Sequence, residues 1–556
     1  MYNRRRVRFW CGVMLSGVAL VSGCSDNPLA VTNQNNPDVD RVYGTPRDVE
    51  TIISKLFQQM WNAQHDFVGI GAQTMVMSLE SHSALANVGM GARAAIPRGT
   101  ISNSLGNATQ SENFRDFDVL TRNSRSAANA IAALDRFIAA GTGTGSKARD
   151  AKARSFAYFT LGYGLANVAL LYDSAAIITP DVASDVVPPL SDSEDVMAAA
   201  LRMIDSALVT SASADATTGA GGWPIPTTWV SGPEITVGRW QQILRSYKAR
   251  WRAGVARTPA EREAVDWNAV VNDALAGIQS DFIVNADATA GWGAQWQLQL
   301  AVDPTWSQMT PMILGMADTT GAYDAWLATP LTARTPFLLR TPDARFPAGA
   351  TRTEQQAVTG SSRAGTAPGS ILYFRNRPAG EDSPAEPWGN WYYDNWRFWA
   401  IRQQGENGPF IAFSLAENEM LAAEGYIRTN RVASAVPLIN KYRTRAGLAA
   451  IPATSDVNTR VPPQPGGVGC VPRVPQPPSY TTTACGNVLE AMKWEKRLET
   501  AFTGYAQWFI DSRGWGDLPE NTVLEWPVPW QELYARINLN LYTTDQVRAA
   551  RGTYGF

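Results

Sequence analysis

The stretch from Ser414 to Leu448, SLAENEMLAAEGYIRTNRVASAVPLINKYRTRAGL, decides the fold of this chain. Its apolar residues recur every three to four positions in two runs, which is the spacing of one face of an α-helix. The inward residues of the two runs are Ala416, Met420, Ala423 and Ile427, then Val432, Val436, Ile439 and Tyr442. Two antiparallel helices in about 34 residues have the size of a tetratricopeptide-type repeat. The stretch therefore predicts a helix pair that ends at Gly447.

The predicted helix pair also contains charged residues and one proline. Glu417, Glu419 and Glu424 lie off the apolar face of the first helix, so we expect them on the outside. Pro437 lies within the second run, where a proline removes a backbone donor and crowds the preceding turn. Either the second helix begins near Ser434, with Pro437 in its first turn, or it is kinked.

The same helical period extends outward from this pair in both directions. A helix is predicted to begin after Thr45, with Pro46 at its first position. The string SDSE at Ser191 is a capping box before another helix. Further apolar stripes occupy residues 127–138, 197–208, 240–255 and 270–278, and a long helix is predicted from about Val488 to Ile510. No comparable series of alternating strands is present, so the chain is predicted to be mainly α-helical.

Residues 155–172, SFAYFTLGYGLANVALLY, carry no charge and therefore have two interpretations. Eighteen apolar residues approach the length of a transmembrane helix. The segment also contains Gly162 and Gly164, which allow neighbouring helices to approach closely, and it follows an amphipathic helix. We favour a helix buried on all sides among other helices.

Residues 281–410 have a different composition, with many Gly and Pro and no sustained helical period. Eight of the 20 tryptophans of the chain lie here, at positions 292, 296, 306, 326, 388, 391, 396 and 399. Aromatic rings on loops that a rigid scaffold holds are suited to stacking on a ligand. The alternative is that most of these rings fill the core between irregular segments.

The composition also limits the chemistry of the protein. Only two histidines, His65 and His82, are present, which argues against a zinc centre and against a histidine-based nucleophilic triad. We expect each to be a surface or hydrogen-bonded side chain. No phosphate loop, metal cluster or nucleic-acid motif is found, so no cofactor and no metal are predicted.

The N-terminal residues indicate export. Residues 1–23 combine four arginines, a short apolar stretch and VSG before Cys24, which is the pattern of a signal peptide. VSGC resembles a bacterial lipobox, so Cys24 is predicted to carry acyl chains such as palmitate that anchor the protein in a membrane. Residues 24–44 are polar and turn-rich and suit a tether. Removal of the four arginines leaves a mildly acidic chain, which argues against nucleic-acid binding.

Cys470 and Cys485 are the cysteines that remain after Cys11 is removed and Cys24 takes lipid. In an oxidising compartment they are predicted to form a disulfide. The surrounding segment, residues 451–486, is rich in proline and cannot be helical. We expect a long exposed loop that the disulfide holds together.

The motifs described so far resemble those of the SusD/RagB-like outer-membrane lipoproteins, which act with TonB-dependent transporters in nutrient uptake. The resemblance rests on the lipobox, on the helix pair, on EKRLETAFTGYAQWFIDSRGWGD and on PVPWQEL near the end. The matching residues are Ala416, Glu417, Ala423, Glu424, Asn440, Arg443, Arg445, Ala446, Gly447, Glu495, Arg497, Glu499, Gly504, Pro527 and Pro529. Thr503, Ala506 and Phe509 depart from the usual Glu, Arg and Asp, which indicates a divergent branch.

This resemblance implies a SusD-like fold of tetratricopeptide-like helix pairs, with one domain over residues 45–556. It implies a non-catalytic lipoprotein on the outside of the outer membrane, which passes a nutrient to a SusC-like TonB-dependent transporter. We expect an oligosaccharide to stack on aromatic residues of the irregular region and to receive hydrogen bonds from their neighbours. The predicted binding residues are Trp292, Trp296, Trp306, Tyr323, Trp388, Asn390, Trp391, Tyr392, Asp394 and Asn395.

Two other functions remain open at this point. Some relatives bind peptides, and an aromatic platform suits a peptide as well as a glycan. A lipid-anchored glycoside hydrolase would need two carboxylates about 5 to 9.5 Å apart in one cleft. Asp318, Asp324 and Asp394 lie near the aromatic residues, but no spacing singles out a pair.

Overall fold

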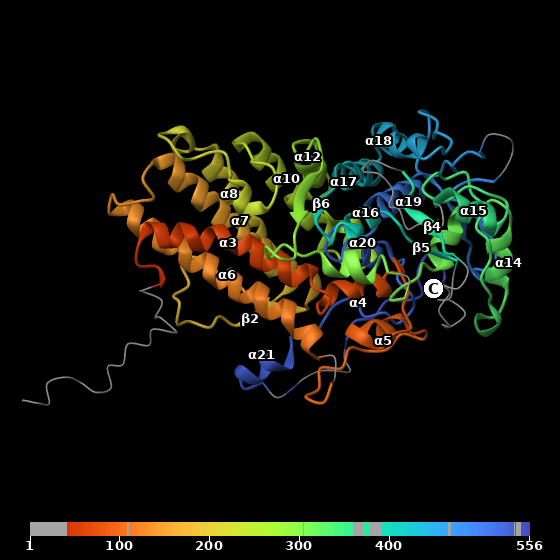
Figure 1. Cartoon of the computed structure of the whole chain (residues 1–556), viewed down its shortest axis with the longest axis horizontal. Coiled ribbons are helices and arrows are strands. Elements are labelled where there is room, and N and C mark those ends of the chain that lie inside the picture. The colour runs from red at the N-terminus through yellow and green to blue at the C-terminus, as the bar shows by residue number, and fades with distance from the viewer. Residues whose placement is uncertain are drawn as a thin grey trace, which may run out of the picture.

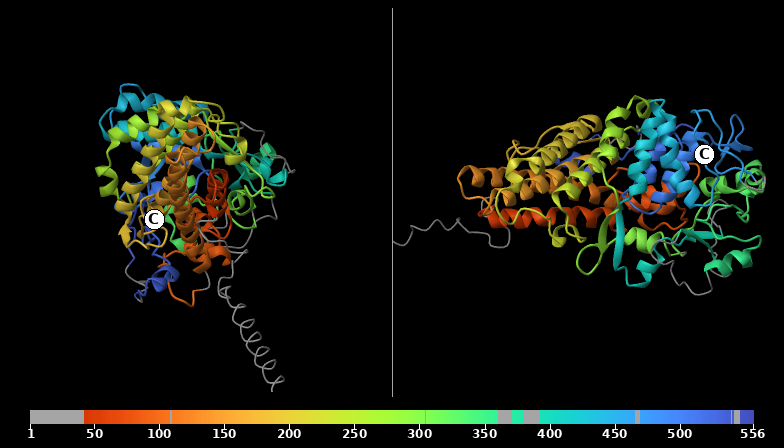
Figure 2. Two further views of the ribbon diagram at one scale, coloured as in Figure 1. Left: turned by 90° about the vertical axis from the view of Figure 1, so that its left-hand side faces the viewer. Right: turned by 90° about the horizontal axis from the view of Figure 1, so that it is seen from above.

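The computed structural model describes residues 42–107, 110–303, 305–359, 371–378, 392–464, 469–538, 540 and 546–556. Long helices form one end of the molecule, and short helices, two-stranded sheets and loops form the other (Figure 1). Seen from above, the two ends follow one another along the longest axis (Figure 2). The chain is thus mainly α-helical, as the sequence predicts.

The long helices of the N-terminal half pack side by side. They are α3 Pro46–His65, α6 Gln110–Ala139, α7 Lys147–Leu171, α8 Ser193–Ala212 and α10 Val237–Gly254. The shorter helices of this half are α4 Ile70–Met77, α5 Met90–Ala94, α9 Thr227–Val230, α11 Pro259–Ala264 and α12 Trp267–Leu275. The Thr45 side chain accepts a hydrogen bond from the Asp48 amide, which confirms the predicted start of α3. The cap of α8 is Asp192, one residue after the predicted Ser191.

Helix α7 contains the uncharged segment 155–171, and every side chain of that segment except Tyr158 is buried. A Cβ atom on Gly162 would lie 3.0 Å from the Ala200 carbonyl oxygen of α8, and one on Gly164 would lie 2.2 Å from Ser124 Oγ of α6. The two glycines therefore let α7 sit tightly between its neighbours. Within the described ranges, no helix combines the length and the apolar character needed to cross a bilayer.

The deciding stretch forms α17 Leu415–Arg428 and α18 Val432–Arg445. All eight predicted inward residues belong to one hydrophobic cluster with α19 Val488–Thr500. Helix α18 begins at Val432, close to Ser434, but Pro437 lies inside the helix, so the alternative that places Pro437 in the first turn is wrong.

Two of the glutamates predicted to be outside are buried instead. Glu417 binds Arg250 of α10, with 2.6 Å between carboxylate oxygen and Nε, and Glu424 binds Arg262 of α11. Only Glu419 stays partly exposed, 2.7 Å from Lys441 Nζ. The outward positions of α17 thus face other helices, because the α10–α12 segment covers them.

The predicted helix 488–510 is interrupted. Helix α19 ends at Thr500, and α20 runs over Gln507–Trp515. Between them Phe502 and Ala506 have positive φ values of 56° and 57°, which an α-helix does not permit. The Phe502 amide donates to Glu80 Oε1 at 2.6 Å, so a contact 422 residues away along the chain satisfies the interrupted backbone.

The strands form four two-stranded antiparallel sheets within the described residues. They are β1 Ser174–Ala176 with β2 Leu190–Asp192, β3 Phe282–Ala286 with β6 Gly408–Phe413, β4 Phe374–Asn376 with β5 Tyr393–Asn395, and β7 Arg473–Pro475 with β8 Thr483–Cys485. In the β3–β6 pair Val284 lies opposite Phe410, so the irregular region leaves the helical scaffold and returns to it at one place.

Short elements fill the rest of the loop-rich end. They are the π-helical turn Trp296–Leu300, α13 Pro311–Leu314, α14 Ala322–Ala328, α15 Arg352–Thr359 and α16 Trp399–Gln403, with 3-10 turns at Gly315–Ala317 and Leu331–Ala333. Elsewhere, α21 Trp530–Ala535 projects from the lower edge of the body (Figure 1), the 3-10 turn Asn87–Gly89 contacts α4 and α5, and the 3-10 turn Ala214–Thr217 packs on α7 and α8. One large hydrophobic core runs through both ends and includes residues from Tyr43 to Tyr554.

Candidate functional site

Three of the predicted ligand-stacking aromatics are core residues. Trp292 is 4% exposed, and Trp296 and Tyr323 are each 1% exposed. Trp296 Nε1 donates to the Gln64 carbonyl at 3.1 Å, and Tyr323 Oη donates to the Met312 carbonyl at 2.7 Å. These rings leave no face for a ligand, so the structure corrects this part of the prediction.

Asp394 and Asn395 are buried as well, each 1% exposed. Asp394 binds Arg375 through two hydrogen bonds of 2.8 and 2.9 Å, and Asn395 Oδ1 accepts from the Arg397 amide. Their polar atoms hold the β4–β5 region together, and neither is placed to meet a ligand.

The acids that a hydrolase would use have structural partners too. Asp318 is buried and accepts from Thr320 Oγ1 at 2.8 Å and from the Tyr323 amide at 3.2 Å. Asp324 lies 3.4 Å from the Arg473 guanidinium.

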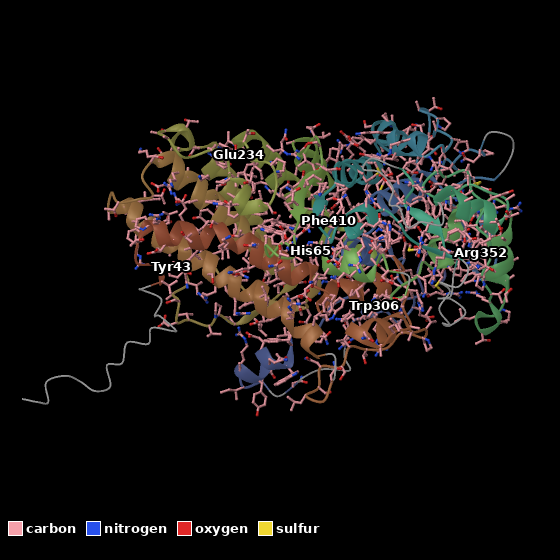
Figure 3. All side chains as sticks on the ribbon, in the orientation of Figure 1. Tyr43, His65, Glu234, Trp306, Arg352 and Phe410 are labelled. Carbon is pink, nitrogen blue, oxygen red and sulfur yellow. A yellow bond between two sulfur atoms is a disulfide. The ribbon has the colours of Figure 1, made fainter. Side chains whose placement is uncertain are left out.

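Trp306 and Tyr392 are the predicted aromatics that keep partial exposure. The Arg352 guanidinium carbon lies 4.2 Å from the Tyr392 ring centroid. The Met309 amide donates to the Tyr393 carbonyl, so the segments that carry the two rings are neighbours. Figure 3 labels Trp306 and Arg352 in this part of the molecule. Trp388, Asn390 and Trp391 lie outside the described residues.

Both histidines are buried, each 2% exposed. His65 Nδ1 lies 2.6 Å from Gln297 Nε2, and its ring packs on Trp61 with 3.8 Å between centroids (Figure 3). Burial lowers the pKa of His65 to about 3, and the hydrogen bond from Gln297 opposes that shift only in part. His65 is therefore a neutral, hydrogen-bonded core residue.

Cys470 and Cys485 are joined by a disulfide. No helix occurs in the described part of residues 451–486, in line with its proline content. The segment is not fully exposed, however, because Ile451, Val461 and Cys470 pack into the cluster of α17, α18 and α19. Strands β7 and β8 rise from this base and present the turn 476–482 to solvent.

This turn forms one wall of a groove, which we call the C-terminal groove. Its volume is about 450 Å³, within the range of small-ligand sites. Its walls are residues 327–331 and Arg334 after α14, residues 479–481 of the clipped loop, residues 519–521, and residues 551 and 554–556, with Ile96, Pro97 and Met312 completing the lining. Asp324 of α14 accepts from the Thr483 amide and so fixes the first wall to the second.

Tyr480 is the aromatic residue at the tip of the clipped loop. Its φ is 55°, and its amide donates to the Gln476 carbonyl at 2.9 Å, which closes a tight turn. The Arg551 guanidinium carbon lies 4.5 Å from its ring centroid. A Cβ atom on Gly555 would lie 2.3 Å from Tyr480 Cγ, so only glycine lets the ring take this place. The C-terminal segment thus positions Tyr480 in the groove.

Arg334 provides a cation on the wall that follows α14. Its guanidinium donates to the Thr329 carbonyl at 2.9 Å and to the Leu327 carbonyl at 3.2 Å, and it lies 4.1 Å from the Trp326 ring centroid. Partial burial lowers the pKa of Arg334, but an arginine stays charged at neutral pH. The groove therefore combines aromatic and aliphatic surface with a few fixed polar groups.

The chemistry of the groove suits binding. Among the residues that line it, only Glu520 has a carboxylate side chain, whereas glycoside hydrolysis uses two such side chains. In the described parts of the chain, no group of three His, Cys, Asp or Glu side chains is arranged to hold a metal ion. Ring faces, hydroxyls of Ser479 and Thr481 and the Arg334 guanidinium can together stack on and hydrogen-bond a polar chain molecule.

A larger hollow of about 630 Å³ lies between α6, α7 and α8. Its charged side chains already have partners: Lys147 lies 3.1 Å from Asp215, and Arg154 lies 2.8 Å from Asp135. It has one aromatic residue, Tyr158, and lies among regular helices. We therefore favour the C-terminal groove as the functional site.

Sequence reasoning missed Tyr480, Arg334 and Arg551. Tyr480 could have been suspected, because it is an aromatic residue in a proline-rich loop that a disulfide holds. Arg334 and Arg551 carry no local pattern. Their role depends on segments that meet only in the folded chain.

The structure thus belongs to the class of tetratricopeptide-like helical scaffolds, here with a groove built from loops. No protein-family model matches the sequence, and no curated protein matches it either. A SusD homologue from Parabacteroides distasonis matches with a TM-score of 0.55 and 13% identity, over 91% of this chain and 97% of the other. A SusD superfamily protein from Bacteroides vulgatus matches with a TM-score of 0.51 and 12% identity, over 91% and 94%. The particular fold of this chain is therefore SusD-like.

Proposed function

We propose that this protein is a SusD/RagB-type lipoprotein of the outer membrane that binds an oligosaccharide in the C-terminal groove. In this proposal Cys24 carries the lipid, the body faces the cell exterior, and the bound nutrient passes to a SusC-like TonB-dependent transporter. The lipobox, the mainly helical SusD-like fold and the single carboxylate side chain of the groove support it.

The observation that carries the proposal is the placement of Tyr480. A half-buried ring lies in a groove of about 450 Å³ that the Arg334 guanidinium also lines. Sugars present an apolar face and a rim of hydroxyls, so a ring supplies stacking while Arg334, Ser479 and Thr481 supply hydrogen bonds.

The test is isothermal titration of the protein with a panel of neutral oligosaccharides, acidic oligosaccharides and peptides. For the ligand that binds, Tyr480→Ala is expected to lower the affinity about tenfold, since a stacked ring contributes about 0.5–1.5 kcal/mol beyond the apolar area that it buries. Tyr426→Ala is the matched control, because Tyr426 is also half-buried and lies under an arginine, 4.9 Å from Arg431, but outside the groove.

Two outcomes would redirect the proposal. If Trp306→Ala lowers the affinity and Tyr480→Ala does not, the ligand binds instead at the neighbouring segments of Trp306 and Tyr392. Binding of peptides alone would keep the site and change the cargo.

A further inference from the structure

Exposed apolar side chains gather on one face around α21. The described chain has eleven large apolar residues with high exposure, and six of them belong to this face. Ile537 is 87% exposed, Val187 is 71% exposed, and Tyr534 and Leu105 are each 58% exposed. Val186 and Val547 complete the set, which we call the α21 face. Soluble surfaces rarely concentrate such residues unless something covers them.

Hydrogen bonds join the segments that carry the α21 face. The Arg536 guanidinium donates to the Pro188 carbonyl at 2.7 Å, which joins the end of α21 to Val186 and Val187. Asn103 accepts from the Trp530 amide at 3.0 Å, which joins the start of α21 to the loop of Leu105. Gln546, next to Val547, exchanges two hydrogen bonds with the backbone of Ile101.

The chain that leads to Cys24 leaves the described structure beside this face. Tyr43 Oη donates to the Ser126 carbonyl at 3.2 Å, and the preceding residue, Arg125, donates to the Val186 carbonyl at 2.8 Å. Two consecutive residues of α6 thus make these contacts: Ser126 with Tyr43, at the start of the described chain, and Arg125 with Val186, at one edge of the α21 face. Only the residues from Cys24 to Arg41 separate the proposed lipid from this side of the molecule along the chain.

The shape and chemistry of the α21 face fit a lipid surface. Helix α21 projects from the lower edge of the body in Figure 1, so its apolar side chains stand on a protrusion. Trp530 and Tyr534 form an edge-to-face pair on this helix, with 6.4 Å between centroids. Tryptophan and tyrosine are enriched where proteins meet the interface of a bilayer. The exposed Asp185 beside Val186 and the exposed Arg548 beside Val547 have opposite charges, so attraction to anionic lipids is not the driving force.

We propose that the α21 face rests on the interfacial region of the lipid bilayer in which the Cys24 lipid is inserted. The inference rests on the proposed lipid anchor and adds a second, protein-made contact with the membrane. Acyl chains hold the protein at the membrane, and the apolar side chains of the face then fix which side of the body points toward it.

The experiment uses residues 24–556 with Cys24→Ser, so that no lipid is attached and the contact itself is measured. An environment-sensitive fluorophore is placed on Ile537→Cys, and phosphatidylcholine vesicles are added with and without phosphatidylglycerol. Emission at position 537 is expected to rise about twofold and shift to the blue, equally with both lipids, since burial of apolar area drives the contact. Val209→Cys is the matched control, because Val209 is 72% exposed but lies on α8, in the hollow between α6, α7 and α8 and outside the α21 face.

Three results would overturn the inference: no change at position 537, an equal change at position 209, or a change that requires a membrane fraction holding a transporter. The last result would assign the face to a protein partner. Oligosaccharide titration of the same labelled protein reports on the C-terminal groove separately. If no oligosaccharide binds, the result contradicts the proposed function but does not affect the inferred contact with lipid.

Discussion

Gly555 shows how a single missing side chain shapes the candidate site. Its φ of +75° is easy for glycine, and its Cα faces the Tyr480 ring with no room for a methyl group. We expect Gly555→Ala to displace the ring and to lower ligand affinity about tenfold, comparable with removal of the ring itself. Titration of the variant with the ligand found for the parent protein measures this.

Gly141→Ala is the control for backbone strain at Gly555. Gly141 has nearly the same φ, +73°, but nothing lies within 4 Å of the position that a Cβ atom would take there, so the strain is present without the clash. Both variants should lose similar stability, about 1 kcal/mol. Equal affinities of the two variants would show that Gly555 does not position Tyr480.

His65 gives the fold a pH dependence of defined sign. Its pKa is about 3 in the folded protein and about 6.5 in the unfolded chain, so the unfolded chain binds more protons between these values. The stability that neutral His65 contributes is complete above pH 6.5 and is lost as the pH falls toward 3. By pH 5 the loss should reach about 2 kcal/mol.

The measurement is urea unfolding of the parent protein and of His65→Asn at pH 7 and pH 5. The difference between the two proteins isolates His65, because burial raises the pKa of Glu80 to about 8 and of Glu495 to about 7, and these groups act in the opposite direction. A parent protein that loses no more stability than the variant would contradict the assignment of a neutral, buried His65.

At the scale of elements, buried ion pairs connect α17, the first helix of the pair at residues 414–448, to the N-terminal half. Glu424 of α17 and Arg262 of α11 are both fully buried, with Oε2 and Nη2 2.6 Å apart, and Glu424 also accepts from Trp515 Nε1 at 3.0 Å. Removing one partner leaves the other charge buried and alone. We expect Glu424→Gln to lower the free energy of unfolding by about 3–5 kcal/mol.

Asp118→Asn is the comparison for this ion pair. Asp118 pairs with Arg122 four residues along the same helix, at 2.6 Å, but the arginine is largely exposed. Chemical denaturation should show a loss of at most about 1 kcal/mol for this variant. Similar losses for the two variants would mean that Glu424 is solvated in solution.

Helical faces were predictable from the sequence, whereas contacts between distant helices were not. The inward residues of α17 and α18, such as Met420 and Ile439, follow from a period that the chain carries locally. The burial of Glu417 and Glu424 depends on Arg250 and Arg262, which lie more than 160 residues away. The end of α19 at Thr500 depends in the same way on Glu80.

At the scale of the whole molecule, the C-terminal groove was the least predictable feature. Its lining comes from six separate parts of the chain, between Ile96 and Phe556, which meet only in the folded protein. The aromatic-rich region 281–410 indicated a platform, but Trp292, Trp296 and Tyr323 are needed to fill the core between its short elements. The abundance of aromatic residues in region 281–410 therefore did not predict the position of Tyr480, the groove residue that lies outside this region.

We propose that residues 45–556 unfold as one unit. The large core holds side chains from Tyr43 to Tyr554 and so runs through both ends of the molecule, and α17 and α19 contribute side chains both to it and to the smaller cluster around α18. Thermal unfolding followed by calorimetry should give one transition. A ligand at 100 times its dissociation constant should stabilise the protein by about 2.7 kcal/mol and shift that whole transition upward. Two transitions, of which the ligand moves only one, would divide the chain into two domains.

The groove also has a consequence for the synthesis of the protein. Residues 551 and 554–556 line it, and Gly555 holds the Tyr480 ring in place. In the proposed function, a ribosome must translate through these codons before the groove can bind a ligand, although every long helix has been made by then. A chain terminated shortly before Arg551 should therefore retain most of its helical circular dichroism and lack ligand binding.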